Sequence, residues 1–163
     1  MKTIKLNLYS FSELKEDIKQ KVLEEYRDIN VDYEWWDYTL EDAKDIGLEI
    51  KEFDIYRNEI NGELIDDIES VIKSIYKNHG KNCDTYKTAK DYKQMLKSLN
   101  ELENDNYSYD YDELSDNFKI DLLQNYYKML QKEEEYLISD EAIIETFEAN
   151  EYTFEANGKM RNE

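Results

Sequence analysis

Apolar and polar residues alternate near the beginning of the chain, over residues 3–9. The apolar positions are Ile4, Leu6 and Leu8. This period of two predicts a half-buried strand. From residue 11 to residue 29 the apolar positions recur every three or four residues instead, which predicts a helix. Ser10 and Glu13 have the spacing of a capping box at the beginning of that helix.

The next segment predicts a second helix and then two strands. The helix is expected from Asp32, a candidate N-cap, to Gly47, where a glycine ends the apolar stripe. Residues 48–55 predict a strand, and a slip in its alternation indicates a β-bulge. Asn61-Gly62 is a hairpin signal that leads into a further extended segment at residues 64–65.

The middle of the chain has the helical period. Helices are expected over residues 66–80, 85–102 and 112–137, with a polar turn at 104–110, a last helix capped by Ser139, and a short strand at 152–154 before the Asn157-Gly158 turn. Strands therefore cluster at the two ends of the sequence, and helices occupy the region between them.

This order of elements predicts an α+β fold. We expect a small, mostly antiparallel sheet that joins the N- and C-terminal strands and is covered by the helix-rich middle. The length of 163 residues suits a single domain, residues 1–163. Within it, residues 85–117 are a candidate for a helical hairpin that protrudes from the body.

Charge narrows the classes of partner. The chain has 40 acidic and 21 basic residues, and its formal net charge is -19. Such a charge repels nucleic acid and anionic membrane surfaces, because phosphate binding needs a basic face. It attracts a basic partner. We therefore expect neither direct nucleic-acid binding nor membrane binding.

Signals for the cellular compartment are few. Cys83 is the single cysteine, so no internal disulfide can form and a reducing compartment is expected. The N-terminal residues alternate and do not form the apolar core of a signal peptide. No apolar stretch approaches the ~18 residues of a membrane span. These features predict a cytoplasmic protein.

Residues suited to catalysis are scarce. His79 is the single histidine and precedes Gly80, a position typical of a helix C-terminus. Cys83 lies nearby, but no further Cys or His could complete a metal site or a nucleophile–base set. Residues 105–112 resemble a calcium loop but lack its glycine. We predict no catalytic residue, no metal site and no cofactor.

The adjacent pair Trp35-Trp36 is the most distinctive local feature of the sequence. One interpretation makes Trp36 a core residue and lets Trp35 partly cover a neighbouring element. The other makes one of the two an exposed interface anchor. The first is favoured, because adjacent helical positions point about 100° apart. Trp35 is kept as a candidate partner-binding residue.

Two acidic segments contain no basic residue, between Lys97 and Lys119 and between Lys132 and Lys159. They are either solvated helix faces or a surface that imitates a phosphate backbone, with tyrosines as rigid aromatic contacts. The candidate partner-binding residues in these segments are Asp105, Asp110, Asp112, Glu113, Asp116, Glu133, Glu134, Glu135, Tyr107 and Tyr109.

Three segments carry a family resemblance: LYSFSEL at residues 8–14, YRDINVDYEWWD at 26–37 and SDEAIIET at 139–146. They resemble a family of small acidic phage- and prophage-encoded proteins of low-GC bacteria, mostly uncharacterised and sometimes labelled antitoxin-like. The resemblance covers the beginning and end of the chain. It identifies a family and not a chemistry, so it implies no catalytic residue.

These observations support one hypothesis and two alternatives. The hypothesis is a phage or mobile-element protein that inhibits a host defence nuclease, or another nucleic-acid-binding complex, through an acidic surface that mimics nucleic acid. Such inhibitors are of the anti-CRISPR or anti-restriction type. Its partner would be a basic host protein or nucleoprotein complex in the bacterial cytoplasm. The alternatives are an antitoxin-like protein that neutralises a toxin and, third, a carboxylate- or metal-dependent enzyme.

Overall fold

The computed structural model describes residues 1–102 and 105–161, which divide into two compact units. Unit 1 consists of Met1–Trp35 and Lys132–Glu163, and unit 2 of Trp36–Gln131. Helices and short antiparallel strands occur together in the described residues, which confirms the α+β class. The single domain expected from the sequence stays a prediction, and we describe each unit by itself.

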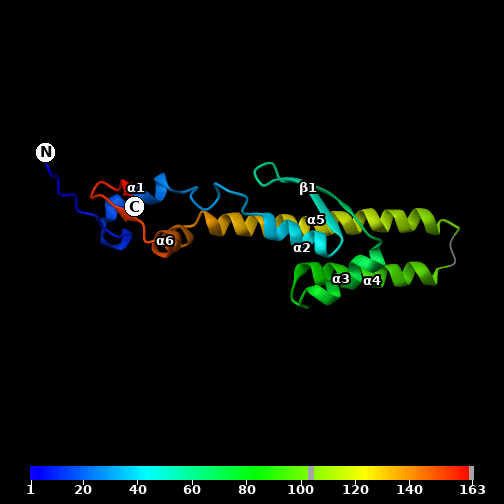
Figure 1. The fold of residues 1–163 in the computed structure, drawn as a ribbon. Coiled ribbons are helices and arrows are strands. Elements are labelled where there is room, and N and C mark those ends of the chain that lie inside the picture. Colours follow the sequence, from blue (N-terminus) through cyan, green and yellow to red (C-terminus); the bar gives the residue numbers. More distant parts are fainter. Residues whose placement is uncertain (103–104, 162–163) are drawn as a thin grey trace. The chain divides into compact units, whose positions relative to one another are not determined.

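Figure 1 labels the main elements along the chain. Unit 1 contains the 3-10 helix η1 (Phe11–Glu13), α1 (Glu16–Glu25), α6 (Asp140–Ala149), β3 (Thr153–Phe154) and β4 (Met160–Arg161). Unit 2 contains α2 (Asp37–Asp45), β1 (Leu48–Asp54), β2 (Glu59–Leu64), α3 (Ile68–Asn78) and α4 (Asp84–Glu101). Helix α5 (Tyr107–Leu137) begins in unit 2 and ends in unit 1.

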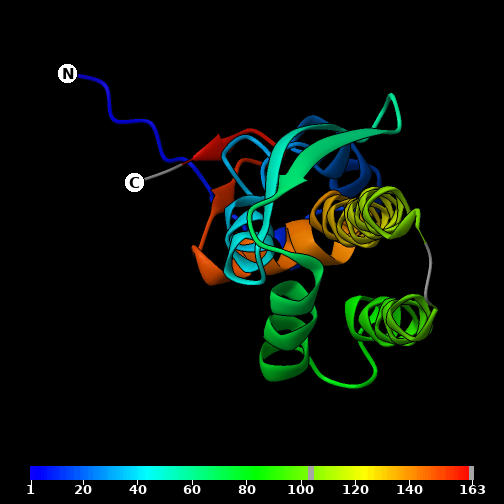
Figure 2. The ribbon, with the colours of Figure 1, turned by 90° about the vertical axis from the view of Figure 1, so that its right-hand side faces the viewer.

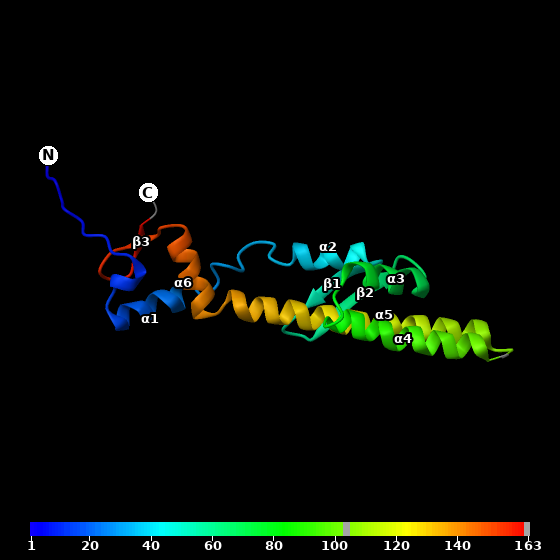
Figure 3. The same ribbon diagram turned by 90° about the horizontal axis from the view of Figure 1, so that it is seen from below.

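Helices α4 and α5 run side by side in unit 2, as two views show (Figures 1 and 3). The rings of Tyr92 and Phe118 lie 4.9 Å apart between them. The Tyr92 hydroxyl donates to an Asp121 carboxylate oxygen at 2.6 Å. Helix α4 also packs against α3, and the protruding hairpin expected over residues 85–117 stays a prediction.

Helix α5 is buried on two of its sides within unit 2 (Figure 2). Phe118, Leu122 and Tyr126 face the other helices and are fully buried. Leu123 and Tyr127 point to the β1–β2 hairpin: Leu123 lies beside Gly62, and the Tyr127 hydroxyl donates to the Ile55 carbonyl at 2.8 Å. The hairpin therefore closes the core on the side opposite α4.

The β1–β2 hairpin contains the predicted bulge, between Ile50 and Glu52. The turn predicted at Asn61-Gly62 is wrong, because Gly62 lies inside β2 opposite Ile50. The actual turn follows Asp54, whose carboxylate accepts from two successive backbone N–H groups beyond it. This Asx-type capping supplies the turn without glycine.

The core of unit 1 is an aromatic cluster built from both ends of the chain, around α1 and α6 (Figure 3). Phe147 of α6 lies 5.5 Å from the Phe11 ring and 5.1 Å from the Phe154 ring. The N- and C-terminal segments meet in one antiparallel bridge, in which Tyr9 and Phe154 exchange two backbone hydrogen bonds of 2.8 Å.

The predicted N-terminal strand over residues 3–9 is wrong apart from this bridge. Ile4 and Leu6 are 87% and 52% exposed, so their alternation has no apolar face to bury. The terminal pairing is completed by β3 and β4, on either side of the predicted Asn157-Gly158 turn. Strands β1 and β2 belong to a separate two-stranded sheet in unit 2 and not to a sheet that joins the termini.

Several predicted helix boundaries also shift. The helix expected over residues 11–29 breaks after η1, because Leu14 and Lys15 have extended backbone. Helix α5 begins at Tyr107, five residues before the expected Asp112. Ser139 caps α6 as predicted, accepting from the Ala142 N–H at 3.2 Å.

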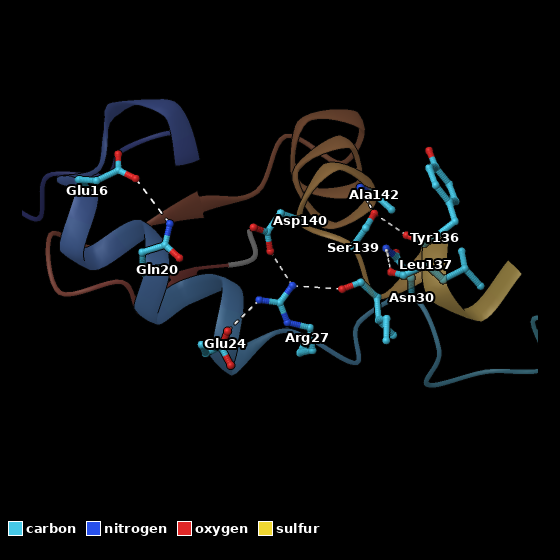
Figure 4. Close-up of polar contacts among 11 residues, drawn as sticks. Glu16, Gln20, Glu24, Arg27, Asn30, Tyr136, Leu137, Ser139, Asp140 and Ala142 are labelled. Atoms are coloured by element: carbon cyan, nitrogen blue, oxygen red, sulfur yellow. Dashed lines mark hydrogen bonds and ion pairs between the residues drawn. The ribbon is translucent and has the colours of Figure 1, made fainter. Parts of the chain in front are cut away.

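Arg27 and Asn30 connect the segment after α1 to the beginning of α6 (Figure 4). The Arg27 guanidinium donates to Asp140 at 2.6 Å and to the Ile138 carbonyl at 3.0 Å. Asn30 is buried and donates to the Leu137 carbonyl at 3.0 Å, while its amide oxygen accepts from the Thr146 hydroxyl at 2.6 Å. The bonds to the Leu137 and Ile138 carbonyls satisfy backbone acceptors at the end of α5, where no further helical N–H group is available.

The close approach at Gly62 leads to a stability prediction. A Cβ there would lie 2.3 Å from the Glu49 carbonyl oxygen, so we expect Gly62→Ala to lower the free energy of unfolding by about 1–3 kcal/mol. Gly80→Ala is the matched control, because no atom lies within 4 Å of its Cβ position. Urea unfolding of both variants measures the difference, and equal losses would contradict the strand register.

A second prediction concerns the buried amide of Asn30. Asn30→Ala leaves the Leu137 carbonyl and the Thr146 hydroxyl without this partner. The Thr146 hydroxyl can still donate to the Ala142 carbonyl at 3.0 Å, so the Leu137 carbonyl is the group that loses its side-chain donor. An unsatisfied buried polar group costs about 1–3 kcal/mol, so the free energy of unfolding should fall by about that amount. Asn7→Ala, at an exposed position, serves as the control in the same urea titration. A loss no larger than that of the control would show that these bonds add nothing.

Candidate functional site

An exposed stripe on α5 brings together part of the acidic cluster that the sequence predicted. Tyr109, Asp112, Glu113 and Asp116 are spaced at three, four and seven residues and therefore share one side of the helix. All four are exposed, and Tyr109 is 72% exposed. Ile120, four residues after Asp116, extends the stripe and is 52% exposed. We call these five residues the α5 stripe.

The α5 stripe lies on the same side of the helix as Leu123, which is buried further toward the C-terminus. Tyr109, Asp116 and Leu123 follow one another at seven-residue steps, so they point in nearly the same direction. Leu123 is covered by the β1–β2 hairpin, whereas Tyr109 and Asp116 are exposed. The ion pair between Lys119 and Glu63 of β2, at 3.4 Å, marks where this cover begins. The stripe is therefore the part of this helix side that the β1–β2 hairpin leaves uncovered.

The carboxylates of the α5 stripe carry uncompensated charge. Within residues 1–102 and 105–161, Asp112, Glu113 and Asp116 form no ion pair. Carboxylates one to four residues apart on an exposed helix repel each other, which opposes folding. Asp110, also predicted, is half-buried, and Asp105 is exposed in the segment before the helix.

The other tyrosines of this region are already engaged inside unit 2. The Tyr107 hydroxyl donates to Asn100 at 2.7 Å, and its ring stacks on Tyr111 at 6.1 Å. The Tyr111 hydroxyl donates to Glu69 at 2.8 Å. Burial, followed by this hydrogen bond, raises the pKa of Tyr111 from 10.0 to about 12. Tyr109 is therefore the tyrosine of the three that is best placed for a partner.

The second predicted cluster lies in unit 1 and does not form one face. Glu133 and Glu135 are exposed and Glu134 is half-buried. Adjacent helical positions point about 100° apart, so the three carboxylates spread around the helix. Nearby, the Tyr136 hydroxyl donates to Glu145 at 2.8 Å, and this bond raises the pKa of Tyr136.

Both tryptophans are half-buried, so the placement of Trp36 in the core is wrong. Helix α2 begins one residue after Trp36, which therefore lies at the helix end rather than on its inward face. The Trp36 ring packs edge-on against Phe53 of β1, 5.6 Å away. Trp35 belongs to unit 1, and its role as a partner-binding residue stays a prediction.

His79 belongs to a polar network that sequence reasoning missed. Its Nδ1 lies 2.6 Å from the Thr85 hydroxyl and its Nε2 lies 3.1 Å from an Asp42 carboxylate oxygen. The other Asp42 oxygen accepts from the Tyr126 hydroxyl at 2.7 Å. Burial, followed by this bond, raises the pKa of Tyr126.

The His79 network is suited to joining helices. It has the order of a hydroxyl–imidazole–carboxylate set, but Thr85 and Tyr126 are fully buried, and only Asp42 reaches solvent to a large extent. A substrate therefore has no access to the Thr85 hydroxyl. The network links α2, the end of α3, α4 and α5 through polar bonds.

Across residues 1–102 and 105–161, no group of three or more His, Cys, Asp or Glu side chains could hold a metal ion. Cys83 is exposed and carries a free thiol. In the same ranges, no helix has the length and apolar character needed to cross a membrane.

Comparisons with known proteins add no relationship. No protein-family model, curated protein or solved structure matches the chain. The family resemblance inferred from the sequence therefore stays a prediction.

The shifted pKa of Tyr111 predicts a response to alkaline pH. A raised pKa means that its contribution to stability is complete below pH 10.0 and is lost as the pH rises through about 12. The loss of stability between these values should be less steep in Tyr111→Phe than in the parent. Tyr109→Phe, at an exposed tyrosine, is the control. Urea unfolding from pH 9 to pH 12 gives the comparison. Equal slopes would contradict the role of the Glu69 bond.

Proposed function

We propose that this chain inhibits a nucleic-acid-binding protein by occupying its basic binding surface with the α5 stripe. The observation that supports this function best is the set of three exposed carboxylates, Asp112, Glu113 and Asp116, without ion-pair partners among the described residues. Aromatic and aliphatic side chains lie at the two ends of this set, Tyr109 and Ile120. A basic channel offers the complementary charge.

The energetics favour a partner of opposite charge. Each unpaired carboxylate adds to the self-repulsion of a chain whose net charge is -19. A row of lysines or arginines on the partner removes this repulsion on binding and also speeds the encounter. Tyr109 and Ile120 would add apolar contact area, and exposed tyrosine is a frequent contributor to interface energy. The carboxylates supply specificity, and the two apolar residues supply contact area.

The class of partner follows from the same charge. Proteins that bind nucleic acid present clustered Lys and Arg for the phosphates, so a competitor for that surface must be acidic. A host defence nuclease or a related nucleoprotein complex in the bacterial cytoplasm is the partner class that we propose, with the chain encoded by a phage or mobile element. This is the anti-CRISPR or anti-restriction type of inhibition. The chain itself would bind neither nucleic acid nor membranes.

The proposed function can be tested by reversing the charge of the stripe. The partner is first captured from a bacterial host lysate with the intact chain and identified by mass spectrometry. The variant Asp112→Lys/Glu113→Lys/Asp116→Lys should then bind it more weakly by several kcal/mol, because like charges would face each other. Nuclease inhibition should be lost in parallel. Circular dichroism checks that the variant folds, since lysines near a helix N-terminus cost roughly 0.3–1 kcal/mol each.

The matched control changes the net charge equally at another place. Glu25→Lys/Glu141→Lys/Glu148→Lys alters three exposed carboxylates of unit 1. It should bind nearly as well as the parent. Equal weakening in both variants would mean that total charge matters and the stripe does not. Binding that resists high salt would favour an antitoxin-like apolar interface instead.

A further inference from the structure

A group of lysines in unit 2 lines a groove between α3 and α4. The groove has a volume of about 810 Å³. Its floor is apolar and consists of Ile72, Leu96 and Tyr76. Four ammonium groups line it, those of Lys73, Lys90, Lys93 and Lys97. The last three of these lysines lie on α4, and Lys73 lies on α3.

These lysines stay unpaired in a chain with nearly twice as many acidic as basic residues. Over residues 1–102 and 105–161, none of the four forms an ion pair. Glu69 also lines the groove, but it accepts the hydroxyl of Tyr111. Glu101 is the second lining carboxylate. The groove therefore has an excess of positive charge next to apolar surface, which suits a ligand with an anionic group and an apolar body.

The net charge of the chain limits how many negative charges such a ligand can carry. A nucleic acid or an acidic protein carries many negative charges, and a chain of net charge -19 repels all of them. A ligand with one or two charges meets mainly the nearby ammonium groups, because more distant charges are screened beyond about 8 Å at physiological salt. The groove volume of about 810 Å³ also lies within the range of small-molecule sites.

The surroundings of Tyr76 favour an aliphatic chain over an aromatic ring as the apolar part of the ligand. One side of its ring stacks on Tyr86, with centroids 4.5 Å apart. The Lys93 ammonium lies 5.0 Å from its centroid. A nucleobase could stack on Tyr76 only by displacing the Tyr86 ring or the Lys93 ammonium. An aliphatic chain needs no stacking face and can lie along Ile72 and Leu96.

We propose that the α3–α4 groove binds an acyl-chain carboxylate, with its chain on Ile72 and Leu96 and its carboxylate among the lysines. This site is independent of the partner proposed for the α5 stripe. The two regions of unit 2 are opposite in charge and lie on different helices, so a variant in one leaves the residues of the other unchanged.

Decanoate is the probe, titrated below its aggregation concentration into the full chain and followed by isothermal calorimetry and by methyl NMR. Binding should perturb the methyl signals of Ile72 and Leu96 first. Affinity should rise from acetate to octanoate to decanoate, by at most about fourfold per CH₂ group. Decanol, which has the chain but no charge, should bind more weakly than decanoate.

Two double variants locate the site. Lys90→Gln/Lys97→Gln removes two charges from the groove and should weaken decanoate binding by about fivefold or more. Lys81→Gln/Lys87→Gln removes two charges from outside the groove lining and should leave binding within twofold. Equal weakening in both variants, no binding by the parent at millimolar decanoate, or tighter binding of adenosine monophosphate than of decanoate would each overturn the proposal.

Discussion

Helix α5 carries apolar side chains on two of its sides. The arrangement of unit 2 depends on burying both sides. Phe118 and Leu122 are buried against the other helices, and Leu123 is buried against the β1–β2 hairpin. Full burial of such a side chain stabilises the fold by roughly 1.5–3 kcal/mol. The hairpin is short, so its cover stops near Lys119. The first turns of the helix are therefore left exposed, and the α5 stripe lies there.

Tyrosine hydroxyls serve as hydrogen-bond partners for several half-buried and exposed carboxylates. Among the described residues, tyrosine hydroxyls donate to Asp42, Glu69, Asp121 and Glu145 at distances of 2.6–2.8 Å. These bonds satisfy a carboxylate without neutralising it. The packing requirements of the chain are therefore met while its net charge of -19 remains for long-range interactions.

Positive and negative side chains of unit 2 gather in separate places, and the two proposed binding regions lie there. The unpaired lysines of the groove and the unpaired carboxylates of the stripe belong to the same unit, yet they do not neutralise each other. The groove lysines lie on α3 and α4 and the stripe carboxylates lie on α5, and no ion pair joins the two sets within residues 1–102 and 105–161. One unit can therefore present an acidic surface to a basic protein and a basic groove to a small anion.

The sequence by itself determined the elements whose signals are local. The bulge in β1, the Ser139 cap of α6 and the end of α2 at Gly47 agree with it, because a phase slip, a side-chain acceptor and a positive φ act within a few residues. It also identified the acidic segments and Tyr109, since composition and charge need no fold to be seen.

Only the tertiary structure decided which of these residues act together. Asn61-Gly62 has a hairpin signal, but the capping by Asp54 and the packing of Gly62 against Leu123 place it inside a strand. Ile4 and Leu6 alternate correctly and have no partner surface, so they form no strand. The His79 network joins residues from Asp42 to Tyr126, the groove forms where α3 and α4 pack together, and the position of the β1–β2 hairpin decides which part of α5 stays uncovered. Burial and contact between such residues are properties of the packed chain, and no local pattern encodes them.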